Sequence, residues 1–226
     1  MIEPGFLNIL FDLDGTLSDT EEGIVKSVQH ALAAFSVQEE DPASIRRFIG
    51  PPLRESFRLF YGMTAEEAER AVAKYRERYE TVGVYENRLF DGVPGMLAAL
   101  RRAGKRLAVA TSKPTVFARK VLRQHDIERY FEVVVGCELD GRRDTKEEVI
   151  SEALRQLGIG ETERKNTVMV GDRRHDLNGG KAFGLKTVGL RLGFADPGEL
   201  EACHPDHIAA DIAELTAYLL GSKAEI

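Results

Sequence analysis

Two carboxylates end an apolar run near the N-terminus, in the sequence Phe6-Leu7-Asn8-Ile9-Leu10-Phe11-Asp12-Leu13-Asp14-Gly15-Thr16. The apolar residues predict a buried strand that delivers Asp12 and Asp14 to its C-terminal edge. In open α/β sheets, ligands bind in the crevice outside that edge. Two carboxylates so close together need a positive group between them, and Mg²⁺ provides one because it prefers oxygen ligands. The alternative is an Asp-Gly turn that only ends the strand.

Further apolar runs follow along the chain, and helical patterns separate most of them. This alternation predicts βαβ units and a doubly wound parallel sheet, the α/β fold class. Glycines at the ends of three helical patterns favour left-handed caps there. The runs are Leu107–Ala110, Val133–Val135, Thr167–Val170 and Lys186–Leu190, and the helices are expected near 94–102, 114–124, 145–157, 175–183 and 211–220.

The segment from about 18 to 85 interrupts this alternation, because it holds helical signals and no convincing strand. Asp41 before Pro42 is typical of a helix N-cap with proline in the first turn. Thr64 and Glu67 have the spacing of a capping box. We therefore expect an α/β core domain over 1–17 and 88–226 with an all-helical insert over 18–87.

Composition narrows the class of protein. The chain has 226 residues, 43% apolar and 30% charged, which is the composition of a soluble globular protein. Its net charge of −6 argues against a nucleic-acid polymer or an anionic membrane as partner. The presence of only two cysteines, Cys137 and Cys203, argues against a disulfide framework. Without a signal peptide or a stretch of about 20 apolar residues, we expect a cytoplasmic protein.

Polar groups also follow other predicted strands. Hydroxyls at Thr111 and Ser112 could bind an anion or could cap the next helix. Lys146 begins a predicted helix and could neutralise a phosphate, although most lysines lie on the surface. Asp172 and Asp176 follow another strand, and either cap a helix or add to the acidic group at the first strand. Two acidic strand ends on one sheet favour a metal-assisted site.

These segments together resemble the four signatures of the haloacid dehalogenase superfamily. They stand in the expected order, and the similarity covers nearly the whole chain, including the position of the helical cap. It is greatest to the 5′-nucleotidase-like and phosphoglycolate-phosphatase-like branch. The signatures are Asp12-Leu13-Asp14-Gly15-Thr16, Thr111-Ser112, Lys146, and Gly171-Asp172 with Asp176.

The resemblance implies a role for each residue of the first signature and for the lysine. Asp12 corresponds to the nucleophile that takes the phosphoryl group. Asp14 corresponds to the general acid and base, and its backbone carbonyl joins the metal. Lys146 holds the phosphate and orients Asp12. Because dehalogenases lack a carboxylate at the position of Asp14, the pattern favours a phosphatase or a phosphomutase.

The remaining signatures complete the implied site. Thr111 or Ser112 hydrogen-bonds the phosphate, and Asp172 is a metal ligand together with Asp12 and Asp14. Asp176 is an outer-shell residue that holds Asp172, water or Lys146. The implied cofactor is Mg²⁺. The implied substrate is a small phosphorylated metabolite, with the protein a monomer or homodimer.

The helical insert is expected to close over the site and read the leaving group, with hinges near 17–20 and 85–93. Candidate contacts are Arg46, Gly50, Pro51 and Arg54, although Gly50-Pro51-Pro52 could simply connect two helices. An aromatic group, Phe48, Phe57, Phe60 and Tyr61, could stack on a base or form the core of the insert.

Nucleoside 5′-monophosphates are the favoured substrates. Arg173 stands where the phosphoglycolate pattern usually has Thr or Ser, which weakens the alternative of a 2-phosphoglycolate phosphatase. A phosphomutase is a further alternative, because it would return the phosphoryl group to a sugar. A non-catalytic module with the same fold is the third, and the complete set of acidic residues argues against it.

Overall fold

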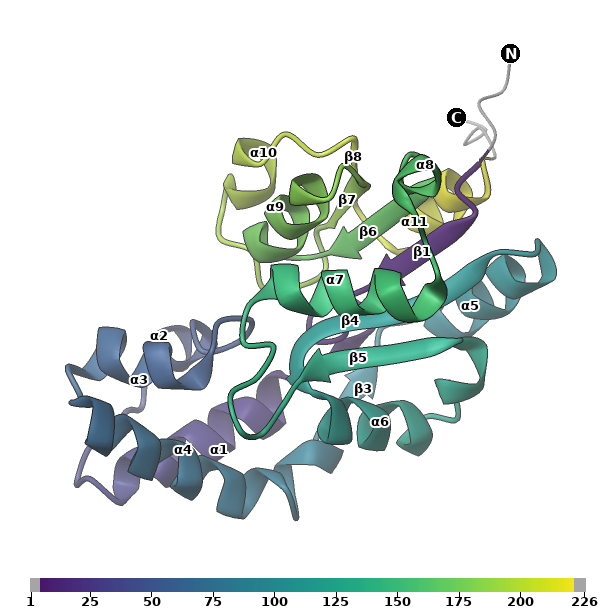
Figure 1. Cartoon of the computed structure of the whole chain (residues 1–226). Helices are drawn as coiled ribbons and strands as arrows, with labels where there is room; N and C mark the ends of the chain where they lie inside the picture. The colour runs from purple at the N-terminus through teal and green to yellow at the C-terminus, as the bar shows by residue number, and fades with distance from the viewer. Residues whose placement is uncertain (1–4, 222–226) are drawn as a thin grey trace. The chain divides into compact units, whose positions relative to one another are not determined.

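The computed structural model describes residues 5–221, which form two compact units (Figure 1). The first unit holds the described residues up to Ser18 and those from Leu89 onward, and Asp19–Arg88 form the second. The two chain segments that join the units, β2 (Ser18–Asp19) and β3 (Arg88–Leu89), pair with each other as a small sheet. Among the described residues, no helix combines the length and the apolar character that crossing a membrane requires.

A six-stranded parallel sheet in the order β5-β4-β1-β6-β7-β8 forms the centre of the first unit. The predicted α/β class is confirmed, and β1 lies between β4 and β6. The three-residue strand β8 was not predicted, because its sequence is too short to show a period. The strands are β1 (Asn8–Phe11), β4 (Arg106–Pro114), β5 (Val133–Cys137), β6 (Thr167–Gly171), β7 (Lys186–Leu190) and β8 (His207–Ala209).

Helices cover both faces of this sheet. Figure 1 shows α7 in front of the strands and α5 and α11 behind them. The predicted helices are present within one or two residues of their expected ends. The helices are α5 (Val93–Arg102), α6 (Thr115–Gln124), α7 (Lys146–Leu157), α8 (Glu161–Arg164), α9 (Arg174–Ala182), α10 (Glu199–Ala202) and α11 (Ile212–Leu220), with a 3₁₀ turn at η2 (Glu128–Tyr130).

Local sequence sets the limits of α7. Thr145 and Glu148 form a capping box, in which each side chain binds the other residue's backbone N–H at 3.2 Å. The helix therefore begins at Lys146. Gly158 ends it in the left-handed conformation, with φ 69°.

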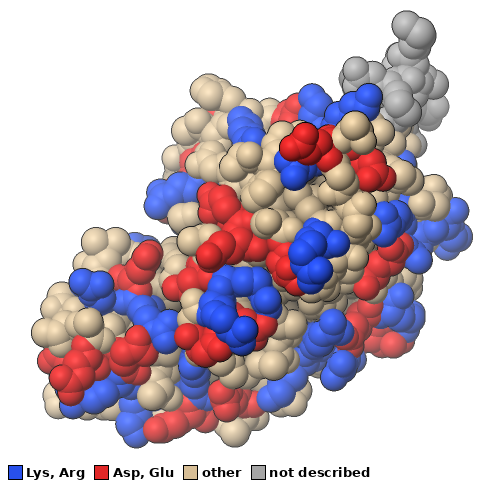
Figure 2. Space-filling model, viewed as in Figure 1, with Lys and Arg blue, Asp and Glu red and all other residues tan. Residues whose placement is uncertain are grey.

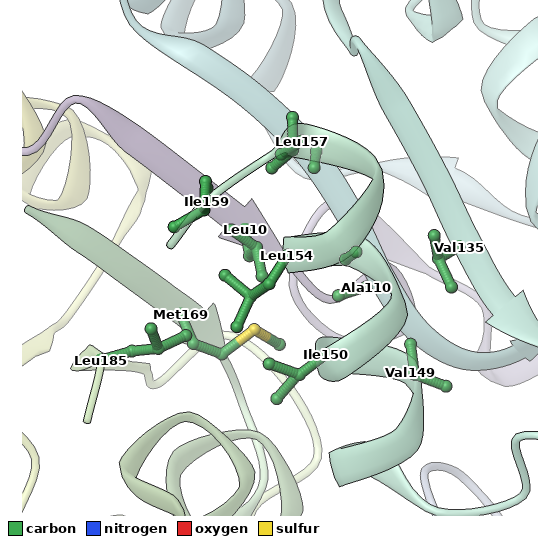
Figure 3. Packing of buried hydrophobic residues seen from close by; sticks show 12 residues of the cluster. Leu10, Ala110, Val135, Val149, Ile150, Leu154, Leu157, Ile159, Met169 and Leu185 are labelled. Atoms are coloured by element: carbon green, nitrogen blue, oxygen red, sulfur yellow. The ribbon is translucent and has the colours of Figure 1, made fainter. Parts of the chain in front are cut away.

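A continuous apolar layer lies between α7 and the strands (Figure 3). Leu10 of β1 and Met169 of β6 are completely buried against Ile150 and Leu154 of α7. Truncating one such side chain to alanine typically costs about 2–5 kcal/mol. This packing fixes α7 relative to the strand ends, and so fixes the start of α7 relative to the C-terminal edge of β1.

The second unit is helical. Thr64 and Glu67 form the predicted capping box, and the Asp41 side chain accepts a hydrogen bond from the N–H of Ala43, as an N-cap does. Its elements are α1 (Glu21–Ala33), α2 (Pro42–Arg46), α3 (Leu53–Tyr61), α4 (Ala65–Tyr79) and the 3₁₀ turn η1 (Gly83–Tyr85).

The aromatic group of this unit forms part of its core. The rings of Phe57 and Phe60 lie edge-on to Phe48, with centroids at 4.9 and 5.3 Å, and the Tyr61 ring lies at 6.0 Å. Phe48 and Phe57 are almost completely buried. Of the two interpretations of these side chains, the structure favours the core over a base-stacking surface.

Candidate functional site

Three buried carboxylates meet at the C-terminal edge of neighbouring strands. Asp12 follows β1, Asp172 follows β6, and Asp176 lies in the first turn of α9. One oxygen from each lies within 4.8 Å of the others. The order of the sheet produces this meeting, because β1 and β6 pair in parallel and their C-terminal ends are adjacent.

Lys146 lies among these carboxylates. Its Nζ atom is 3.1 Å from Asp12 Oδ1 and 2.7 Å from Asp176 Oδ1, and it donates a hydrogen bond to the carbonyl of Ala110 at 3.2 Å. Burial lowers the pKa of Lys146, but the charges of Asp12 and Asp176 outweigh burial and raise that pKa above its ordinary value. Lys146 therefore carries a positive charge in the centre of the site.

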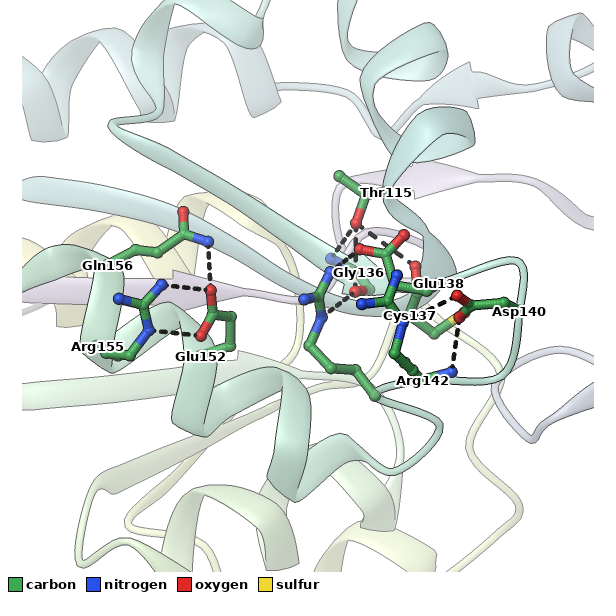
Figure 4. Close-up of polar contacts among 10 residues, drawn as sticks. Thr115, Gly136, Cys137, Glu138, Asp140, Arg142, Glu152, Arg155 and Gln156 are labelled. Atoms are coloured by element: carbon green, nitrogen blue, oxygen red, sulfur yellow. Dashed lines mark hydrogen bonds and ion pairs between the residues drawn. The ribbon is translucent and has the colours of Figure 1, made fainter.

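Polar contacts hold the segment that leads to Lys146 (Figure 4). Thr115 Oγ1 accepts a hydrogen bond from the N–H of Gly136 at 3.0 Å, which ties the start of α6 to the end of β5. In the loop that follows, Arg142 Nε donates to Asp140 Oδ2 at 2.9 Å. The first contact fixes the end of β5, from which the loop to α7 begins.

Asp172 is fully buried, and the hydrogen-bond donors that contact its carboxylate within residues 5–221 are neutral. Thr16 Oγ1 donates to its Oδ1 at 3.1 Å, and the N–H of Phe194 donates to its Oδ2 at 2.7 Å. Burial, followed by the charges of Asp176 and Asp12, raises the pKa of Asp172 well above its ordinary value. Lys146 pairs with Asp12 and Asp176, and Asp172 adds a third carboxylate to the cluster. A divalent cation held by carboxylate oxygens therefore fits the charge and the donor chemistry here.

Glycines make room for the carboxylates. A Cβ atom on Gly15 or on Gly193 would lie 2.2 Å from Asp172 Oδ2. A Cβ atom on Gly171 would lie 2.2 Å from the Cβ of Asp176. Larger residues at these positions would displace the acidic side chains. Gly15 also has φ +78°, a conformation that favours glycine.

Asp14 lies apart from the cluster of three carboxylates and pairs with Lys113. The distance from Lys113 Nζ to Asp14 Oδ2 is 2.7 Å, and the Lys113 side chain is only 4% exposed. Sequence reasoning gave Lys113 no role. Its position directly after Thr111-Ser112, at a strand end, was the available signal.

Thr111 and Ser112 lie within β4, whereas the sequence predicted that this strand ends at Ala110. The strand continues to Pro114, which pairs with Cys137 of β5. The strand can extend because Gly136 lacks a side chain, and a Cβ atom there would lie 2.0 Å from the Lys113 carbonyl oxygen. Thr111 Oγ1 accepts a hydrogen bond from the Lys113 N–H at 3.2 Å.

The four candidate substrate contacts of the helical insert lie in the second unit. Arg46 forms a two-pronged ion pair with Glu21, at 2.8 and 3.0 Å, and Arg54 pairs with Glu69. Gly50 and Pro51 lie between α2 and α3. Substrate binding by these residues stays a prediction.

On the face shown in Figure 2, acidic and basic side chains are interspersed.

Comparisons with known proteins agree with this geometry. Residues 9–190 match the family described as haloacid dehalogenase-like hydrolase. A protein named 5′-nucleotidase from Pseudomonas aeruginosa is 47% identical over 94% of this chain and 95% of its own. The Mycobacterium tuberculosis protein named tyrosine-protein kinase PtkA is 44% identical over 82% of this chain and 62% of its own.

Solved structures show the same similarity. The crystal structure of a predicted phosphatase from Clostridium acetobutylicum superposes with a TM-score of 0.91 at 39% identity. The match covers 96% of this chain and 99% of that one. The chain belongs to the haloacid dehalogenase-like hydrolases and is an enzyme of the phosphatase type within that family, as the sequence predicts.

Proposed function

We propose that this enzyme hydrolyses nucleoside 5′-monophosphates in the presence of Mg²⁺, with Asp12 as the phosphoryl acceptor. The observation that carries this proposal is the cluster of Asp12, Asp172 and Asp176, in which Lys146 pairs with Asp12 and Asp176. The 47% identity to a protein named 5′-nucleotidase supports the class of substrate.

The proposed reaction has two steps, each a displacement at phosphorus. An oxygen of Asp12 forms a bond to phosphorus while the bond from phosphorus to the nucleoside oxygen breaks. Asp14 gives a proton to that leaving oxygen. Water then attacks the phosphoaspartate, Asp14 takes a proton from it, and phosphate and free Asp12 are released.

Repulsion between the Asp12 carboxylate and the phosphate is the main obstacle to the first step. Lys146 lies 3.1 Å from Asp12, so its charge offsets this repulsion and orients the carboxylate. Asp12 and Asp172, with the backbone carbonyl of Asp14, would hold Mg²⁺, with Asp176 outside them. The bound ion would supply further positive charge at the phosphate.

The proposal also assigns roles to two hydroxyl residues and to the helical unit. Thr111 and Ser112 would donate hydrogen bonds to phosphate oxygens. Residues 18–87 would form a cap that excludes water. Substrate specificity would come from contacts of the leaving group with Arg46, Gly50, Pro51 and Arg54.

The first experiment is a phosphate-release assay with Mg²⁺ on nucleoside 5′-monophosphates, 2-phosphoglycolate and hexose phosphates. We expect kcat/KM for the nucleotides to exceed that for the other esters by at least about tenfold, which is about 1.4 kcal/mol of transition-state discrimination. Activity confined to 2-phosphoglycolate would refute the nucleotide assignment. Transfer of the phosphoryl group to a sugar, with little free phosphate, would identify a phosphomutase.

A second experiment tests the covalent step. Asp12→Asn keeps the shape of the side chain but replaces the nucleophilic carboxylate by an amide, so we expect no phosphate release above background. Acid quenching of the wild type with radiolabelled substrate should give label on the protein, and Asp12→Asn should give none. Label of equal intensity on the variant would place the acceptor elsewhere.

A further inference from the structure

Arg173 forms a buried ion pair that the proposed reaction does not use. Its Nε atom lies 3.0 Å from Glu199 Oε1, and the two side chains are only 10% and 6% exposed. The backbone N–H of Arg173 donates to Asp176 Oδ2 at 3.0 Å. Arg173 therefore connects the turn after β6 with Glu199, the first residue of α10.

Glu199 is held firmly in this position. Its Oε1 atom also accepts a hydrogen bond from the Arg174 N–H at 2.8 Å, and its Oε2 atom accepts one from the Asp196 N–H at 3.1 Å. Burial raises the pKa of Glu199, but the hydrogen bonds from Arg173, Arg174 and Asp196 outweigh burial, so the pKa ends below its ordinary value. A charged Glu199 fastens the end of the loop 191–198 to the start of α9.

The same loop contacts Asp172 through its backbone. Phe194 N–H donates to Asp172 Oδ2 at 2.7 Å, and Gly193 packs directly on the carboxylate. The loop is thus tied to the turn after β6 at two points. One is the Arg173–Glu199 pair, and the other is the carboxylate proposed as a ligand of Mg²⁺.

We propose that Arg173 and Glu199 are positioning residues, which hold the loop 191–198 against Asp172 and thereby set the affinity of the site for Mg²⁺. This inference rests on the proposed function, because it takes Asp172 as a ligand. Without the pair, Phe194 is free to move away, and the Asp172 carboxylate loses a donor that fixes its rotation. Partners that orient metal ligands typically change metal affinity by about 10–100-fold.

Calorimetric titration of the whole chain with Mg²⁺, in the absence of substrate, tests this directly. Arg173→Met and Glu199→Gln should each raise the Kd for Mg²⁺ by about tenfold, the low end of that range, because they act through the loop. The double variant should match the single variants, because both substitutions break one connection. Arg173→Lys keeps the charge opposite Glu199 but loses the guanidinium geometry, so its Kd should lie between those of wild type and Arg173→Met.

Arg78→Met is the matched control. Arg78 pairs with Glu86 at 2.7 Å, and these side chains, 21% and 19% exposed, both lie in the second unit. The control loses an ion pair and some stability, yet its Kd for Mg²⁺ should equal that of wild type. Glu199→Gln preserves side-chain shape and so tests the inference even where Arg173→Met lowers the folded fraction.

The outcomes separate this inference from the function on which it rests. Wild type that binds no Mg²⁺ refutes both. Wild type that binds Mg²⁺, with unchanged affinity in Arg173→Met and Glu199→Gln, refutes the positioning role alone. An increased KM for the phosphate ester in Arg173→Met, at unchanged Kd for Mg²⁺, would make Arg173 a substrate contact and overturn the inference.

Discussion

Asp176 should make the metal-free protein less stable as the pH rises, and Asp176→Asn should remove this effect. The side chain is completely buried. Burial and the charge of Asp12 raise the pKa of Asp176 from 3.8 to about 7, against the opposing effect of Lys146. The folded protein therefore keeps a proton on this carboxyl between about pH 4 and pH 7, where the unfolded chain has released it.

The size of the effect follows from that difference in pKa. A raised carboxyl pKa contributes stability that is fully present below pH 3.8 and is lost as the pH rises toward 7. At about 1.4 kcal/mol for each pH unit, the total loss is about 4 kcal/mol, of which about 3 kcal/mol falls between pH 5 and pH 8. Asparagine resembles the protonated carboxyl and carries no charge at either pH.

Urea unfolding at pH 5 and pH 8, in the presence of a chelator, measures the effect. Between pH 5 and pH 8, we expect the free energy of unfolding of wild type to fall by about 3 kcal/mol more than that of Asp176→Asn. Asp126→Asn is the control, because the Asp126 side chain is 82% exposed and asparagine also tolerates its positive φ of 54°. This variant should show the wild-type dependence on pH.

Mg²⁺ should remove most of the loss in wild type, since a bound cation stabilises the ionised carboxylates. Equal pH dependence of wild type and Asp176→Asn without metal would refute this origin of the pH dependence. That result would mean that Lys146 alone compensates the charge of these carboxylates and that they need no further cation.

Two further substitutions test the packing and the pairing in the site. Gly171→Ala should lower the stability measured by thermal unfolding by at least about 2 kcal/mol, because the alanine Cβ would lie 2.2 Å from the Cβ of Asp176. The control is Gly95→Ala in α5, which has open space around it and should be neutral or stabilising. Lys113→Met should lower kcat about 100-fold, the low end of the range expected for general acid–base catalysis, because it releases Asp14. The calorimetric Kd for Mg²⁺ should be unchanged. Unchanged kcat would leave Lys113 without a part in the reaction.

The strand ends and the helix limits were predictable because they depend on neighbouring residues. Apolar runs mark the central strands, and Thr145 with Glu148 marks the start of α7. In a parallel sheet, successive strands bring their C-terminal ends to one edge, so Asp12 and Asp172 could be expected to meet before any coordinates were known. Elements too short to show a periodic pattern, such as the three-residue strand β8, could not be predicted in this way.

The partners of the acidic residues could be identified only from the tertiary structure. Lys113 and Asp14 are 99 residues apart, and Arg173 and Glu199 are 26 apart. The residues next to a lysine or glutamate in the sequence do not show whether a distant loop will cover its side chain. A buried one therefore cannot be distinguished from a surface one. The order of residues along the chain thus determined that acidic groups follow the strands. The packing of distant segments decided which donors each carboxylate contacts, a lysine for Asp14 and neutral groups for Asp172.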